Sequence, residues 1–278
     1  MLRLALHFRL AFLLLSLTAL TACGAVRGIL SVDLPVERLE PRVIAVYPHD
    51  PDAFTEGLLL ANGRLYESTG RYGQSTLREV DPETGGILRS VRLRDDLFGE
   101  GIALVGSRII QLTWVEGVAL RYDLDSFSQI DELPYSAEGW GMCYDGASLY
   151  TSDGSPAITR RDADTLAALD SVTVVMDGQP VEEINELECV GDSIYANVWH
   201  TRDILRIDKA SGRVTALIDT SSMLTPEQWA SLSSEATLNG IAYDADSGTF
   251  LVTGKLWSWL FEVDFVPQTI RSDVGRFG

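Results

Sequence analysis

Short apolar runs separated by turn residues recur along the middle of this 278-residue chain. Five segments share one pattern, in which an acidic or amide entry leads into an apolar strand, a turn and a second strand that ends in small or polar residues. Their entries lie at Glu56, Glu100, Glu138, Glu186 and Asn239, which are 44, 38, 48 and 53 residues apart. A period of about 40–50 residues built from short strands is typical of propeller blades with four strands each. The pattern therefore predicts an all-β fold, a five-bladed β-propeller.

Two further segments complete this predicted fold. The apolar run at residues 42–47 precedes the first repeat and has no local partner, whereas the last repeat shows only about three strands. We therefore expect residues 42–47 to pair into the last blade and close the ring, which removes exposed strand edges. Between the fourth and fifth repeats, the Thr-Pro-Glu-Gln sequence at residues 225–228 has the capping-box pattern with proline at the first helical position. One short inserted helix is expected there.

The N-terminus has the features of an export signal. Arg3 and Arg9 flank the start, residues 10–22 are apolar or small, and Cys23 follows directly. This run is too short for a bilayer core of about 30 Å, and its order of basic, apolar and small residues is that of a secretory signal. Leu-Thr-Ala before Cys23 resembles the lipobox of bacterial lipoproteins, in which the cysteine becomes the lipid-modified N-terminus. The alternative is an ordinary signal with a chance cysteine.

These observations predict the domain organisation. We expect a signal peptide at residues 1–22, a lipid-anchored tether at 23–41 and a single propeller domain at 42–278. The protein is then exported and anchored to the membrane through a lipid on Cys23, on the periplasmic face or the surface of the bacterial cell envelope. We expect it to be a monomer.

Composition argues against several classes of partner and of cysteine or histidine site. The formal charge is −18, from 22 basic and 40 acidic residues, which argues against nucleic acid as a partner. Three cysteines and three histidines argue against a disulfide scaffold and a multi-ligand zinc site. Cys143 and Cys189 fall on the first strands of neighbouring blades at different depths, so we expect two buried free thiols. A disulfide between them, formed in an oxidising compartment, is the alternative that the sequence leaves open. His49 and His200 are expected to cap or pack rather than to bind metal.

Polar and aromatic side chains are predicted to meet at the propeller axis, because the first strand of each blade lines the central channel. The entries supply Glu56, Glu100, Glu138, Asn185, Glu186 and Asn239, and the second-strand ends supply Trp114, Asp153, Trp199 and Lys255. Trp114, Trp140 and Trp199 occupy related blade positions, which favours an aromatic-walled pocket with a few polar groups. Lys255 is one of only two lysines beside 20 arginines, and it offers a compact point charge rather than a planar fork.

Several strings in the sequence resemble the plant-type glutaminyl-peptide cyclotransferases and their bacterial relatives, in order over about residues 43–264. They include Phe54-Thr55-Glu56-Gly57-Leu58, Phe98-Gly99-Glu100-Gly101, Glu138-Gly139-Trp140-Gly141, Asn185-Glu186-Leu187-Glu188 and Thr253-Gly254-Lys255-Leu256-Trp257. The resemblance implies a five-bladed propeller that converts N-terminal glutamine of peptides and proteins to pyroglutamate and releases ammonia. It also implies an aminoacyltransferase that needs no cofactor for catalysis, and no metal ligands are assigned. The acids expected along the channel leave a structural Ca²⁺ there as a separate option, because a hard cation suits oxygen ligands.

The resemblance also assigns roles to individual residues. Glu100 takes the place of the family's catalytic glutamate, and Asn185 and Lys255 match its polar active-site residues. The aromatic substrate-binding walls correspond to Phe54, Trp114, Trp140 and Trp199. Glu56 stands where the family often has glutamine, and two close carboxylates are expected to raise the pKa of at least one of them.

The residues suit this chemistry, because the substrate's α-amine attacks its own side-chain amide and one carboxyl is enough to move the proton. We expect Glu100 to be that shuttle, while Lys255 and Asn185 bind the amide oxygen. Two alternatives remain open at this point. One is a non-catalytic exported propeller that acts as a binding or assembly platform. The other is a metal-dependent lactonase-type propeller, in which axial acids such as Glu138 and Asp153 hold a hard cation.

Overall fold

A computed structural model of the chain describes residues 35–268. The predicted signal peptide at residues 1–22, Cys23 and most of the tether lie outside the described residues. Within them, 22 strands accompany one α-helix, α1 (Pro226–Ser231), so the predicted all-β class is confirmed. No helix in this part of the chain has the length and apolar character needed to cross a bilayer.

All strands except β14 and β15 form five groups of four, which we call units 1 to 5. Unit 1 contains β2 (Thr55–Ala61), β3 (Arg64–Thr69), β4 (Thr76–Val80) and β5 (Ile87–Arg92). Unit 2 contains β6 (Gly99–Val105), β7 (Arg108–Thr113), β8 (Val118–Asp123) and β9 (Gln129–Pro134). Unit 3 contains β10 (Met142–Tyr144), β11 (Leu149–Thr151), β12 (Ala157–Arg161) and β13 (Ala168–Thr173).

Unit 4 contains β16 (Ile184–Val190), β17 (Ser193–Val198), β18 (Asp203–Asp208) and β19 (Val214–Asp219). Unit 5 contains β20 (Leu238–Asp244), β21 (Thr249–Gly254), β22 (Trp259–Pro267) and β1 (Glu37–Pro48). A hairpin of β14 (Val175–Met176) and β15 (Gln179–Pro180) joins units 3 and 4. Neighbouring strands within each unit are antiparallel. Tight turns join many of them, such as the turn at Asn62-Gly63 between β2 and β3, where both residues have positive φ.

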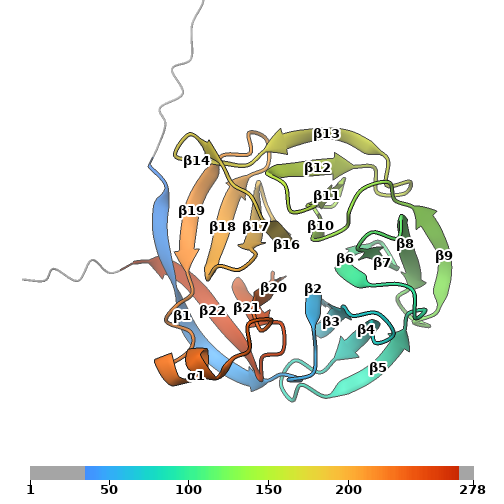
Figure 1. The fold of residues 1–278 in the computed structure, drawn as a ribbon, viewed down its shortest axis with the longest axis horizontal. Coiled ribbons are helices and arrows are strands. Elements are labelled where there is room, and N and C mark those ends of the chain that lie inside the picture. The colour runs from blue at the N-terminus through green and yellow to red at the C-terminus, as the bar shows by residue number, and fades with distance from the viewer. Residues whose placement is uncertain (1–34, 269–278) are drawn as a thin grey trace, which may run out of the picture. The chain divides into compact units, whose positions relative to one another are not determined.

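The first strand of every unit lies at the centre of the described region (Figure 1). These inner strands, β2, β6, β10, β16 and β20, contact one another in sequence order, and β20 in turn contacts β2. The inner strands therefore enclose a common axis, and residues at the start of each one meet there.

The N-terminal strand β1 completes unit 5, as the sequence predicts. It pairs antiparallel with β22 along Leu39–Pro48. It begins five residues before the expected position 42, because Leu39 is buried in the apolar core and Glu37–Leu39 pair in parallel with β19 of unit 4. One continuous strand thus joins units 4 and 5 into an eight-stranded sheet.

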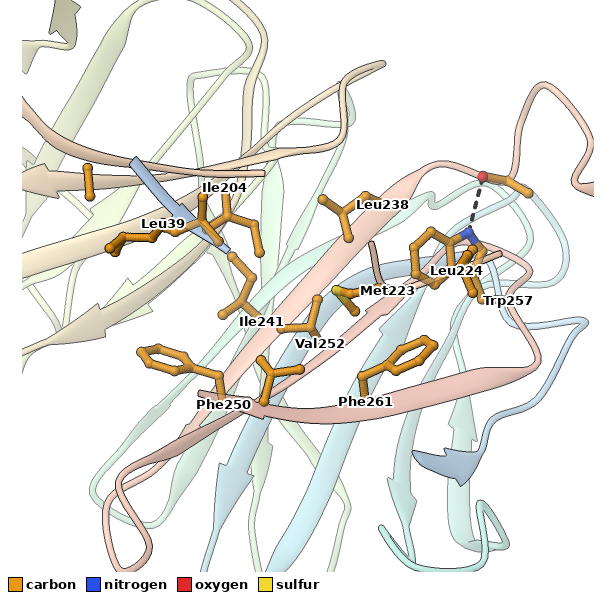
Figure 2. Close-up of a cluster of buried hydrophobic side chains, with 14 residues drawn as sticks. Leu39, Ile204, Met223, Leu224, Leu238, Ile241, Phe250, Val252, Trp257 and Phe261 are labelled. Atoms are coloured by element: carbon orange, nitrogen blue, oxygen red, sulfur yellow. Dashed lines mark hydrogen bonds between the residues drawn. The ribbon is translucent and has the colours of Figure 1, made fainter. Parts of the chain in front are cut away.

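The apolar core lies within and between these units. The largest cluster joins Leu39 of β1 to side chains of units 4 and 5, and Figure 2 shows Ile241 and Val252 near its centre. Trp257 is fully buried there and its indole N–H donates to the carbonyl oxygen of Ala236 at 3.1 Å. This bond fixes the segment before β20 against the loop that follows β21.

The inserted helix α1 has the predicted cap. Thr225 Oγ1 accepts from the Gln228 backbone N–H at 3.2 Å, and Gln228 Oε1 accepts from the Thr225 N–H at 2.8 Å. Pro226 occupies the first helical position, where its missing N–H costs nothing. Trp229 packs edge-on against Trp257, which attaches the helix to unit 5.

The expectation of two free thiols is wrong. Cys143 on β10 and Cys189 on β16 form a disulfide, with their Cα atoms 5.4 Å apart. The inner strands of units 3 and 4 run side by side, and the register of β16 shifts between Ile184 and Leu187. Counting residues from the strand entry misses this irregularity, and so it places the two cysteines at different depths.

Candidate active site

A cavity of about 270 Å³ opens at the end of the axis where the inner strands begin. All eight residues predicted for catalysis or substrate binding line it: Phe54, Glu56, Glu100, Trp114, Trp140, Asn185, Trp199 and Lys255. Arg71, Phe98 and Glu235 complete the lining. The entry residues and the second-strand ends therefore converge in one place.

Shifts in strand register at the start of the inner strands determine where the polar side chains of the cavity point. Register shifts fall between Thr55 and Gly57 in β2, between Gly99 and Ile102 in β6, and at equivalent places in β16 and β20. Glu56, Glu100 and Asn185 all lie inside these shifts, and a β-bulge re-aims the side chain that it carries.

The glycines that follow the two acids allow the strands to approach. A Cβ atom at Gly57 would lie 2.8 Å from the backbone nitrogen of Ile102, and one at Gly101 would lie 2.6 Å from that of Met142. Only glycine fits this close contact between successive inner strands. The close contact at each glycine thus helps to fix the position of the glutamate that precedes it.

Glu56 and Lys255 form a buried ion pair in the cavity. Lys255 Nζ lies 2.6 Å from Glu56 Oε2, and both side chains are less than a tenth exposed. Burial raises the pKa of Glu56, and the charge of Lys255 opposes that shift. The Lys255 ammonium also lies 4.7 Å from the centre of the Phe54 ring. The Lys255 ammonium is therefore fixed between a carboxylate and an aromatic face.

Glu100 lies in an environment that favours its neutral form. Burial raises its pKa well above the ordinary value, and the negative charges of Glu56, Glu116 and Glu138 raise it further, while Lys255 opposes them. This agrees with the expectation that a second carboxyl at position 56 shifts its neighbour. Glu100 therefore exchanges a proton closer to neutral pH than an exposed glutamate does.

Aromatic rings form two walls of the cavity. On one side Phe98 lies between Phe54 and Trp114, with ring centres 6.3 and 5.8 Å away. On the other side Trp140 and Trp199 meet edge to face at 5.4 Å. The walls are apolar, so polar contacts with a ligand are confined to the few charged and amide groups between them.

Asn185 supplies the unpaired polar atom of the cavity. The residue is 3% exposed, and its Oδ1 has no hydrogen-bond partner within residues 35–268. A buried carbonyl oxygen without a donor costs about 1–3 kcal/mol, so its place on the cavity lining points to a ligand N–H group.

Three lining residues were not predicted. Arg71 lies in the β3–β4 loop with φ +86°, its guanidinium stacks 4.5 Å from the Phe54 ring, and it pairs with Glu235 at 2.9 Å. Glu235 comes from the segment between α1 and β20, which no repeat includes. Phe98 belongs to a quoted string, and its position directly before the Gly-Glu-Gly entry is the signal that identifies it.

Other candidates lie outside the lining. Glu186 accepts from backbone N–H groups of other inner strands, and Asp153 accepts from Ser155 within its own loop. The Asn239 amide donates to the Thr55 carbonyl oxygen at 2.8 Å and to Glu56 Oε2 at 3.4 Å. His49 is buried, hydrogen-bonded to Glu67 and to the Trp257 carbonyl oxygen, which is the expected packing role.

Neither His200 nor the acids of the described residues form a metal cluster. His200 stacks on Trp199 behind the cavity wall, at a centre-to-centre distance of 4.0 Å. Across the described range, no three His, Cys, Asp or Glu side chains form a group that could hold a metal ion.

Comparisons with known proteins agree on one family. Residues 12–265 match the family model described as glutamine cyclotransferase. The chain is 37% identical over 244 residues to a glutaminyl-peptide cyclotransferase of Arabidopsis thaliana, covering 87% of this chain and 76% of that protein. Its structure is similar to the crystal structure of Myxococcus xanthus glutaminyl cyclase, with a TM-score of 0.79 and 41% identity over 84% of this chain and 100% of that one.

Proposed function

This chain belongs to the glutamine cyclotransferase family, and we propose that its axial cavity closes the N-terminal glutamine of peptides and proteins into pyroglutamate with release of ammonia. The observation that carries this assignment is the cavity itself, in which Glu100, Lys255 and Asn185 meet between aromatic walls. The reaction transfers the glutamine acyl group from the side-chain nitrogen to the α-amine, so we place the enzyme among the aminoacyltransferases.

The reaction forms one C–N bond and breaks another. The neutral α-amine attacks the side-chain carbonyl carbon, and the bond from that carbon to the amide nitrogen then breaks. Overall the amine loses a proton and the departing nitrogen gains one, which yields ammonia. Because both reacting groups belong to one residue, the cavity has to hold them in the attacking geometry and move this proton.

Glu100 is the proton carrier in this proposal. Its carboxyl accepts the proton that the amine loses and donates a proton to the leaving nitrogen. A shuttle needs both protonation states near the working pH, and the upward shift of its pKa brings Glu100 towards that range. The negative charge of Glu56 contributes to the raised pKa of Glu100. The ion pair with Lys255 favours the ionised form of Glu56.

Lys255 and Asn185 hold the reacting amide. Lys255 uses one N–H for Glu56, which leaves two donors for the carbonyl oxygen as negative charge develops on it. The Asn185 amide pairs with the substrate amide, its NH₂ donating to the carbonyl oxygen and its unpaired Oδ1 accepting from the substrate N–H. An N-terminal glutamate lacks that N–H, so this pairing favours glutamine.

Several finer features form part of the same proposal. The closed succession of inner strands and the completion of unit 5 by β1 support a five-bladed propeller. The basic and apolar start followed by Cys23 supports an exported protein that is lipid-anchored in the bacterial envelope, and a monomer stays our expectation. The intramolecular chemistry, in which a carboxyl suffices for the proton transfer, supports a reaction without a cofactor.

The test is turnover of defined peptides by the purified full-length protein. A peptide that begins with glutamine should lose ammonia and gain a pyroglutamate terminus, which mass spectrometry detects. Matched peptides that begin with asparagine or glutamate, or that carry an acetylated glutamine, should remain unchanged. Absence of turnover from folded protein between pH 6 and 9 would reject the proposal and favour a binding platform.

A further inference from the structure

Two carboxylates outside the lining are held against the aromatic walls of the cavity. Glu138 Oε1 accepts from the indole N–H of Trp140 at 3.1 Å and also from that of Trp114. Both tryptophans line the cavity, so Glu138 bridges the edges of its two aromatic walls. Glu138 is exposed, whereas the carboxyls of Glu56 and Glu100 are buried inside.

Glu116 is the second of these carboxylates. Its Oε1 accepts from the Tyr72 hydroxyl at 2.7 Å, and the Tyr72 ring packs against Phe98 of the cavity wall. This hydrogen bond raises the pKa of Tyr72 to about 12, so the phenol remains a donor. The other oxygen, Oε2, is buried without a hydrogen-bond partner in the described part of the chain. We call Glu116 and Glu138 the acidic rim.

The cations of the cavity do not neutralise the acidic rim. Lys255 is paired with Glu56, and Arg71 is paired with Glu235. Within residues 35–268, neither Glu116 nor Glu138 forms an ion pair. Two carboxylates beside the cavity lining therefore have no counter-ion among the described residues, and the second oxygen of Glu116 has no donor.

We propose that the acidic rim makes the enzyme selective for substrates in which the residue after the N-terminal glutamine is positively charged, and disfavours those in which it is negatively charged. The inference rests on the proposed function, in which glutamine fills the cavity. At about 270 Å³ the cavity lies near the lower limit for ligand pockets, so the chain after glutamine leaves it at the mouth. The unpaired Oδ1 of Asn185 independently marks the interior as a ligand site.

The expected size of the effect follows from the position of the charges. Unit charges about 4 Å apart interact by about 1 kcal/mol in water and by more near a protein surface, and salt screens charges that are exposed. Rim charges mainly alter the rate of encounter and its salt dependence. We therefore expect kcat/KM to rise about threefold to tenfold for a basic second residue and to fall by a similar factor for an acidic one.

The experiment compares three peptides that differ only at the second residue, Gln-Lys, Gln-Ala and Gln-Glu, with the full-length protein at low ionic strength. A fourth peptide carries its lysine at the sixth position, beyond the rim. We expect kcat/KM in the order Lys, Ala, Glu, no advantage for the distant lysine, and convergence of the three values in about 1 M salt.

Variants locate the effect on the acidic rim. Glu116→Gln and Glu138→Gln keep a carbonyl oxygen that accepts from Tyr72 or from the tryptophans, so the charge changes more than the contacts. The ratio of kcat/KM between the lysine and glutamate peptides should fall in each variant and approach unity in the double variant. Asp246→Asn removes one charge in the exposed β20–β21 turn, at the opposite end of unit 5 from Lys255, and should leave the ratio unchanged.

The outcomes separate this inference from the proposed function. Turnover of all peptides at equal rates, or a charge preference that the double variant retains, would overturn the selective role of the rim and leave the enzyme assignment intact. Failure to turn over any glutamine peptide would overturn the proposed function and this inference with it.

Discussion

Two pairs of acids lie on the inner strands, and their surroundings differ. Glu56 and Glu100 line the cavity, where Glu56 contacts the ammonium of Lys255 and Glu100 faces the space for substrate. Glu186 and Glu188 lie on β16 and accept from backbone N–H groups of units 1 and 5. Burial raises the pKa of Glu186 well above its ordinary value and that of Glu188 to about 8.

The comparison shows that a shifted pKa does not by itself identify a catalytic carboxyl. Both pairs have it, and for all four acids burial is the largest cause. What distinguishes Glu100 is access to a cavity, whereas both oxygens of Glu186 are occupied by the N–H groups of Leu58 and Ile241, at 3.3 and 2.9 Å. The second pair joins unit 4 to units 1 and 5, and its function is structural.

The same substitution in each pair should have opposite effects, and this is the largest difference that we expect. Glu100→Gln removes the proton carrier and should lower kcat/KM by about 10²–10⁴-fold, with little change in stability. Glu186→Gln replaces one acceptor oxygen with a donor, which should cost about 1–3 kcal/mol of unfolding free energy and leave activity within about twofold. Peptide turnover and urea unfolding of both variants measure this. Near-normal turnover by folded Glu100→Gln would show that Glu100 is not the proton carrier, and the two pairs would then not differ in catalytic role.

The ion pair gives the next largest effect, because it belongs only to the cavity pair. Lys255→Met leaves the Glu56 carboxylate buried without its cation, which should cost about 3–5 kcal/mol of unfolding free energy. Adding Glu56→Gln removes the uncompensated charge and should restore most of that stability, although not the activity. Urea unfolding of the wild type, the two single variants and the double variant gives a double-mutant cycle, which measures the coupling between the two residues. A double variant no more stable than Lys255→Met would show that the charge is not what destabilises it.

The sequence predicts much of this contrast but not all of it. Repeats place Glu56, Glu100 and Asn185 at strand entries, and the rarity of lysine draws attention to Lys255. Strand alternation does not separate Asn185, which lines the cavity, from its neighbour Glu186, because the register shift in β16 reorients both. Arg71 and Glu235 lie in loops outside the repeat, and their pairing depends on how the chain brings residues 164 positions apart together. Nor does the sequence give the separation of Cys143 and Cys189.

The last expected difference concerns the pH dependence of stability that Glu188 contributes. Glu188 is ionised above about pH 4.5 when unfolded, but its folded pKa is about 8. Below pH 4.5 both states hold the proton, and between these values the unfolded state releases it first. Stability therefore falls as pH rises from about 4.5 to 8, by at most about 1.4 kcal/mol per pH unit from this group, and then levels off.

Glu188→Gln should remove that dependence, because glutamine does not titrate and its carbonyl oxygen still accepts from the Tyr243 N–H. The variant should therefore gain stability over the wild type as pH rises towards 8 and match or fall below it near pH 4.5. Thermal unfolding at half-unit pH steps measures the difference, and Glu83→Gln in the exposed β4–β5 turn controls for the change of net charge. Turnover should be unaffected, since Glu188 does not line the cavity. Parallel stability curves for the variant and the wild type would mean that Glu188 has the same pKa in the folded and unfolded protein. The backbone N–H donors to its carboxylate would then offset the effect of burial.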